Sequence, residues 1–172
     1  MKDIVVLLFD SACIYEIVTL NYFLKFTGKN VIFTSLSGQS VKAMEGYSLN
    51  VDKKLNEIET DQVKLLVIPG GNVSDIDQPV VWDFIGEVKK NGGLIAAICA
   101  GVDVLDHGGF LDGIDSTHST EEDVVVTEEI ITARANAHVD FAIEVARKLD
   151  LFVDEADLKE TIDFWRDHKR ME

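Results

Sequence analysis

Short apolar segments alternate along this chain with stretches of the length and pattern expected of helices. The apolar segments are Ile4–Phe9, Val31–Leu36, Val63–Ile68 and Leu94–Ile98. Strands that are buried on both faces of a sheet are almost continuously apolar, and parallel strands need crossover connections, usually helices. The pattern therefore predicts an α/β fold, with a mostly parallel central sheet and helices on both faces.

Helix signals lie between and after these segments. Asp10 and Ser11 are expected to cap a helix that ends at Gly28. Further helices are expected over Val80–Lys90, Val102–His107, from about Asn136 to Leu149, and from about Ala156 to Asp167. Additional short strands are expected at Asp115–Ser119, Val124–Val126 and Ile130–Ala133, whereas residues 38–60 show little beyond a turn at Glu45–Tyr47.

Length and composition narrow the possible function classes. The 172 residues suit one domain, 1–172, and no apolar run is long enough to cross a bilayer. No signal peptide is recognised, so we expect a cytoplasmic protein. Asp and Glu number 31 against 16 Lys and Arg, a formal net charge of −15. Such a surface repels phosphate backbones and anionic lipids, so nucleic acid and membrane are not expected as partners.

The chain has only two cysteines, Cys13 and Cys99. Two are too few for a disulfide framework or a four-cysteine zinc site, and a reducing compartment fits them best. No metal and no cofactor are expected. Cys13 is interpreted as core packing on the first helix.

Cys99 directly follows an apolar segment and has small neighbours, Ala96, Ala97, Ala100 and Gly101. A nucleophile on a sharp strand-to-helix turn needs small neighbours, because the turn strains the backbone and leaves little room. The N-terminus of the following helix would favour the thiolate, which is the reactive form of cysteine. The alternative is a small buried hydrophobic residue, the commonest role of a free cysteine.

Pro69-Gly70-Gly71 ends the neighbouring apolar segment. Ligands bind beyond the carboxyl ends of parallel strands, so this turn and Cys99 are expected at the same edge of the sheet. Backbone N–H groups of Gly70 and Gly71, together with that of Ala100, could form an oxyanion hole. An ordinary glycine turn is the competing interpretation.

Together, Val67–Gly71 and Ala96–Gly101 resemble the ThiJ/PfpI superfamily, which includes the Parkinson-associated deglycase-like proteins. The resemblance runs across nearly the whole chain. It implies a three-layer, flavodoxin-like sandwich, shared with class I glutamine amidotransferases. It also implies that an acid from the first helix, here Glu16, lies against the cysteine sulfur, where its pKa would be raised. A solvated helix residue is the alternative for Glu16.

The same resemblance implies a histidine near the cysteine. Thr117-His118-Ser119 looks like the family's Thr-His segment, so His118 is a candidate base and acid, with a solvated loop histidine as the alternative. His107, His138 and His168 have no such context and are interpreted as surface or helix residues. Ala100 stands where peptidase members have histidine, which disfavours a peptidase.

Three functions remain in competition. The leading hypothesis, which follows from the resemblance, is an enzyme acting on small carbonyl compounds through Cys99, Glu16 and His118, as in glyoxalases or deglycases. The second is a stress protein in which Cys99 senses oxidation without turnover. The third is a hydrolase or amidase of unknown substrate. Family members usually form dimers, so we expect a homodimer with a small-molecule substrate.

Overall fold

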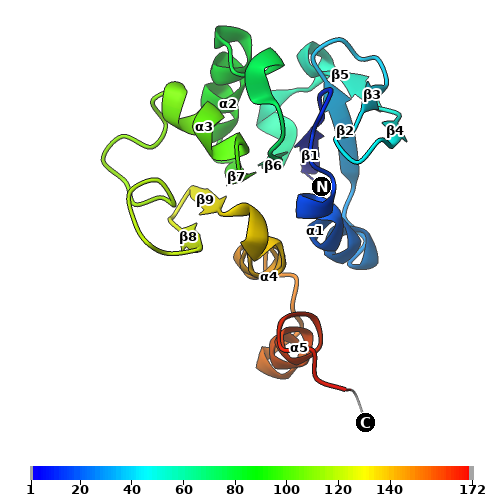
Figure 1. The fold of residues 1–172 in the computed structure, drawn as a ribbon, viewed down its shortest axis with the longest axis vertical. Helices are drawn as coiled ribbons and strands as arrows, with labels where there is room; N and C mark the ends of the chain where they lie inside the picture. The colour runs from blue at the N-terminus through cyan, green and yellow to red at the C-terminus, as the bar shows by residue number, and fades with distance from the viewer. Residues whose placement is uncertain (1, 171–172) are drawn as a thin grey trace.

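A seven-stranded sheet forms the centre of the computed structural model, which describes residues 2–170 (Figure 1). The strand order is β5-β2-β1-β6-β7-β9-β8. All neighbouring strands pair in parallel, except β8 and β9, which pair antiparallel. The strands are β1 (Asp3–Leu7), β2 (Val31–Ser35), β5 (Lys53–Lys54), β6 (Val63–Ile68), β7 (Leu94–Ile98), β8 (Val124–Val126) and β9 (Ile130–Ala133). The predicted α/β fold with a mostly parallel sheet is confirmed.

Helices cover both faces of this sheet. The α-helices are α1 (Tyr15–Phe26), α2 (Pro79–Lys90), α3 (Gly101–His107), α4 (His138–Lys148) and α5 (Glu155–Thr161), the last continuing as a π-helical turn over Ile162–Arg166. Short 3-10 turns span Leu55–Glu57, Thr60–Gln62, Val73–Asp75 and Ala135–Ala137, and β3 (Val41–Lys42) pairs with β4 (Ser48–Leu49). In Figure 1, α5 lies on the far side of α4 from the sheet.

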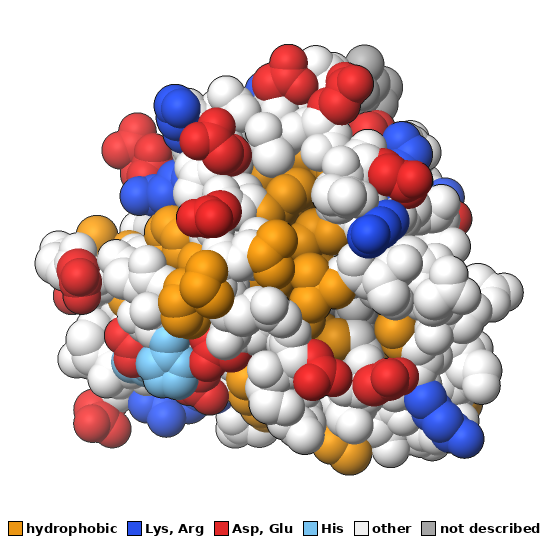
Figure 2. All heavy atoms as spheres, turned by 90° about the horizontal axis from the view of Figure 1, so that it is seen from above, with side chains coloured by type: hydrophobic (Ala, Val, Ile, Leu, Met, Phe, Trp, Pro, Cys, Tyr) orange, Lys and Arg blue, Asp and Glu red, His pale blue; other side chains and the backbone are white. Residues whose placement is uncertain are grey.

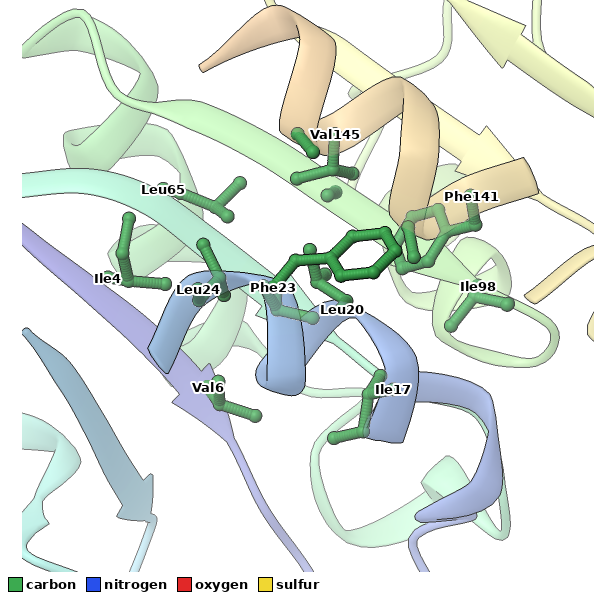
Figure 3. Packing of buried hydrophobic residues seen from close by; sticks show 14 of the residues in the cluster. Ile4, Val6, Ile17, Leu20, Phe23, Leu24, Leu65, Ile98, Phe141 and Val145 are labelled. Carbon is green, nitrogen blue, oxygen red and sulfur yellow. The ribbon is translucent and has the colours of Figure 1, made fainter. Parts of the chain in front are cut away.

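Alternate residues of β1 enter two separate hydrophobic clusters. Ile4 and Val6 pack with α1 and α4, whereas Val5 and Leu7 pack with α2 and α3. Successive side chains of a strand point to opposite faces, so a strand covered on both sides is apolar at every position. Figure 3 shows the first cluster, with Leu20 and Phe23 of α1 between the sheet and α4.

Two local predictions are wrong. Residues 115–119 form turns, in which the Ser116 carbonyl accepts hydrogen bonds from the N–H groups of Ser119 and Thr120, and no strand. Asp10 and Ser11 do not cap α1, which begins later, after Ile14, without a side-chain cap. The Asp10 carboxylate instead accepts the N–H of Lys42 at 2.7 Å, so its capping capacity serves a tertiary contact.

Acidic side chains are spread over the face seen in Figure 2, as the sequence charge leads one to expect. Among residues 2–170, no helix has both the length and the apolar character needed to span a membrane.

Candidate active site

Cys99 occupies a sharp turn between β7 and α3. Its backbone φ of 56° lies in the left-handed region, which is uncommon for a residue other than glycine. The turn is held on both sides: the Cys99 N–H donates to the Ala133 carbonyl at 2.9 Å, and its carbonyl accepts from the Val102 N–H at 3.0 Å. Backbone strain of this kind concentrates at functional sites, where the surrounding structure maintains it.

Two glycines leave the room that this turn needs. A Cβ at Gly101 would collide with the carbonyl oxygens of Ile68 and Pro69. A Cβ at Gly70 would lie 2.6 Å from the Cys99 Cβ, 2.9 Å from its Sγ and 2.8 Å from Glu16 Oε2. The segment that follows β6 therefore approaches Cys99 so closely that only glycine fits at position 70. This close packing explains why the residues around Cys99 are small.

Glu16 lies in the first turn of α1 and is only 1% exposed. Its Oε2 accepts the Gly70 N–H at 2.7 Å, which fixes the carboxylate beside the Cys99 sulfur. Its Oε1 is buried and has no hydrogen-bond partner of ordinary geometry within residues 2–170. Burial raises the pKa of this carboxyl, while the hydrogen bonds from Gly70 and the Cys99 thiol lower it in part.

The thiol beside it is also a weaker acid than usual. Burial, and then the Glu16 carboxylate, raise the pKa of Cys99 to about 11, although the Ala100 N–H acts in the opposite direction. The sequence-based expectation of a favoured thiolate assumed that the helix N-terminus would dominate. In the structure, α3 is short, and burial together with the adjacent acid outweighs its effect on the pKa. The sulfur therefore keeps its proton near neutral pH, beside a carboxylate able to accept it.

The three backbone groups predicted to form an oxyanion hole differ in availability. The Gly70 N–H already donates to Glu16. The Gly71 N–H has no acceptor within residues 2–170, and its φ of 126° suits only glycine. The Ala100 N–H interacts with the Cys99 sulfur. Gly71 and Ala100 are thus the donors that a bound oxygen could use.

His118 lies in the turn at residues 117–119, and its ring contacts α3. Its Nδ1 is 3.0 Å from Asp106 Oδ2 and its Nε2 is 3.2 Å from Asp103 Oδ1, with the side chain 36% exposed. Both ring nitrogens are therefore engaged by carboxylates of α3. No hydrogen bond joins His118 to Cys99 within the described chain, so the structure brings Glu16, but not His118, to the sulfur.

Three further residues near the pair, Cys13, Tyr15 and His138, were not predicted as site residues, and the placement of Cys13 on the first helix is wrong. Cys13 precedes α1, is partly exposed, and donates its N–H to the Gly70 carbonyl at 2.8 Å. The Tyr15 ring meets that of His138 edge to face at 5.7 Å. The sequence could have indicated His138, because it follows β9, and β9 pairs in parallel with β7, the strand that Cys99 follows. Within residues 2–170, no cluster of three or more His, Cys, Asp or Glu is arranged to hold a metal ion.

The sequence pattern of the DJ-1/PfpI family matches residues 2–148. The chain belongs to the DJ-1/PfpI family. This confirms the resemblance that rested on the strand-to-helix turn at Cys99 and on the Pro69-Gly70-Gly71 turn.

Relatives and a solved structure agree with this assignment. The chain is 29% identical over 142 residues to the uncharacterized protease YoaZ of Bacillus subtilis, covering 71% of this chain and 67% of that protein. It is 27% identical over 139 residues to the glutathione-independent glyoxalase DJR-1.2 of Caenorhabditis elegans, covering 72% of this chain and 75% of that protein. A ThiJ/PfpI family protein from Bacillus anthracis shares the fold at a TM-score of 0.88 and 24% identity, covering 98% of this chain and 92% of that one.

Proposed function

We propose that this protein is a glyoxalase-like enzyme that converts small 2-oxoaldehydes into 2-hydroxy acids through Cys99. The observation that carries the proposal is the contact between the strained Cys99 and the buried Glu16 at the carboxyl end of the sheet. The similarity to a protein named as a glutathione-independent glyoxalase supports the choice of reaction.

In the first step, the Cys99 sulfur attacks the aldehyde carbon. Because the pKa of the thiol is raised to about 11, the sulfur must lose its proton as it attacks, and the Glu16 carboxylate beside it accepts that proton. The raised pKa of Glu16 makes it a stronger base than an exposed glutamate. The N–H groups of Gly71 and Ala100 stabilise the negative charge on the former carbonyl oxygen. Glu16 then gives the proton to that oxygen, which yields a hemithioacetal and restores the carboxylate.

In the second step, a proton moves from the former aldehyde carbon to the neighbouring carbonyl carbon. Glu16 is the acid–base group in contact with the sulfur, whereas His118 is bound to Asp103 and Asp106. The product is a thioester of Cys99 with a 2-hydroxy acid. Water then hydrolyses this thioester, releasing the hydroxy acid and restoring the thiol, so the reaction consumes one water and no oxidant.

Methylglyoxal is the substrate for the test, and lactate formation is the measurement. We expect turnover by the native chain and none by Cys99→Ser. Glu16→Gln should lower kcat by about 10²–10⁴-fold, the usual contribution of a general acid–base. His118→Ala is the matched control at a neighbouring ionisable side chain, and it should retain activity within about threefold.

Absence of lactate with the native chain, or equal activity in Cys99→Ser, would contradict the proposal. Loss of activity in His118→Ala comparable to that in Glu16→Gln would transfer the proton-transfer step to the histidine.

A further inference from the structure

Cys13 lies in a short segment that is paired with the glycine turn. Ala12 and Gly71 form an antiparallel bridge, and the Cys13 N–H donates to the Gly70 carbonyl at 2.8 Å. Ala12 is fully buried in the cluster on the α2 and α3 side of the sheet. Successive side chains of an extended segment point to opposite sides, so Cys13 points toward the other side, where Cys99 packs.

Gly70 lies between the two cysteines and contributes no side chain to separate them. Residues facing each other across an antiparallel pair have Cβ atoms about 4.5–5.5 Å apart. Cys13 faces Gly70 in this way, and a Gly70 Cβ would lie 2.6 Å from the Cys99 Cβ. The side chains of Cys13 and Cys99 therefore both lie beside Gly70, on the same side of the turn. The pKa shifts agree with this proximity. The charge of Glu16 raises the pKa of both cysteines, and both cysteines raise the pKa of Tyr15.

We propose that Cys13 is a resolving thiol, which forms an intrachain disulfide with Cys99 after a peroxide has oxidised Cys99. Glu16 accepts the proton of the Cys99 thiol, as it does in the attack on an aldehyde, and the sulfur attacks hydrogen peroxide to give a sulfenic acid. The O–O bond of the peroxide breaks, and the departing hydroxide takes up that proton and leaves as one water. The Cys13 sulfur then attacks the Cys99 sulfur, the S–O bond breaks, and a second water leaves. The two thiols together lose two electrons, which the peroxide takes up.

Glu16 is placed to assist the second step. Its carboxylate contributes to the raised pKa of both thiols, so it lies close enough to affect each of them. It accepts the proton of Cys13 as the disulfide forms and supplies one to the departing hydroxide. A disulfide needs Cβ atoms about 3.5–4.5 Å apart. Disulfide formation therefore requires the segment carrying Cys13, which the Ala12–Gly71 bridge and the Cys13 N–H hold against the glycine turn, to shift toward Cys99.

The consequence is protection of Cys99 from irreversible oxidation. A sulfenic acid without a nearby thiol is oxidised further to the sulfinic acid, which ordinary thiols do not reduce. A disulfide stops that sequence and is reversed by a dithiol. The inference concerns oxidation of the free protein, so it stands whether or not methylglyoxal is the substrate.

Intact-mass and peptide mass spectrometry after treatment with hydrogen peroxide test the proposal. The native chain should lose about 2 Da, yield a linked pair of peptides carrying residues 13 and 99, and recover its mass with dithiothreitol. Cys13→Ser should instead gain about 32 Da at Cys99, without recovery. Cys13→Ala is the second variant, so that a folding defect of either one can be recognised by circular dichroism.

A gain of about 32 Da at Cys99 in the native chain, with Cys13 still alkylated by iodoacetamide, would overturn the proposal. A disulfide between two chains, seen as a doubled mass on a non-reducing gel, would overturn it as well. The lactate assay is run separately on reduced protein, where Cys13→Ser should keep native turnover, so failure of the glyoxalase proposal is recognised independently.

Discussion

Glu16 and Cys99 meet beside the start of α3, whereas His118 meets Asp103 and Asp106 on the outward face of the same helix. Both clusters combine acidic side chains with a possible nucleophile or base. Glu16 is 1% exposed, and burial is the largest cause of its raised pKa. The histidine and its two carboxylates are each substantially exposed to water, which screens their charges. The contrast shows that residue types identify candidate sites, whereas burial determines how far the pKa of each group is shifted.

The largest effect should follow from filling the space between β6 and Cys99. In Gly70→Ala, the new Cβ would lie 2.6 Å from the Cys99 Cβ and 2.8 Å from Glu16 Oε2. We expect a loss of about 1–3 kcal/mol in the free energy of unfolding, measured in urea, together with loss of turnover.

Gly86→Ala is the matched control, because its Cβ would meet only Phe110 atoms at 3.8 and 3.9 Å in the middle of α2. It should raise stability by about 0.5–1 kcal/mol. Equal behaviour of the two variants would show that the close approach at Gly70 is not real.

The reactivity of Cys99 should respond to the buried acid and not to the exposed cluster. Glu16→Gln removes a carboxylate that raises the pKa of Cys99, so the thiolate should form at lower pH. At about pH 9, alkylation by iodoacetamide should accelerate, on the order of tenfold for each unit by which the pKa falls. Asp106→Asn, at the His118 cluster, should leave the alkylation profile unchanged. An unchanged profile in Glu16→Gln would disprove the coupling between acid and thiol.

The strands of the sheet could be predicted because their apolar pattern follows from burial on both faces. β1, β2, β6, β7 and β9 all lie within or close to the expected segments. The short strands β3, β4 and β5 could not, since each has only two residues and depends on neighbours for its hydrogen bonds.

The candidate site shows the same division. The sharp turn at Cys99 and the glycine turn could be predicted from the local sequence, because small residues at the end of a strand indicate a turn with little room for side chains. The contact between Glu16 and Gly70 joins residues 54 positions apart and needs α1 to pack beside β6. The family resemblance implied that Glu16 lies beside Cys99, but neither the resemblance nor any local pattern indicated the bond to Gly70. Cys13 was interpreted as core packing, because nothing in the sequence reveals its pairing with Gly70.

The free energy of unfolding should depend on pH because Glu16 is buried. Its pKa is higher in the folded chain than in the unfolded one, so the folded state binds more protons in that range. Stability contributed by this group therefore falls as pH rises from the unfolded pKa through the folded pKa. Glu16→Gln should be more stable than the native chain at pH 7, and urea unfolding should show that difference shrinking as the pH is lowered toward 4. A native chain that remains the more stable of the two at pH 7 would contradict this account.

The smallest effect is expected at His107, whose Nδ1 lies 2.6 Å from Asp77 Oδ2 on the exposed side. The hydrogen bond to Asp77, and then its charge, raise the pKa of His107. The stabilisation is complete below the unfolded pKa of histidine and is lost as pH rises through the folded pKa. Asp77→Asn should therefore lower the midpoint of the His107 titration, followed by NMR, while urea unfolding changes only slightly because water screens the His107 ring, which is 59% exposed. A large change in stability would mean that exposed pairs in this protein behave as buried ones do, which would remove the distinction between the two sides of α3.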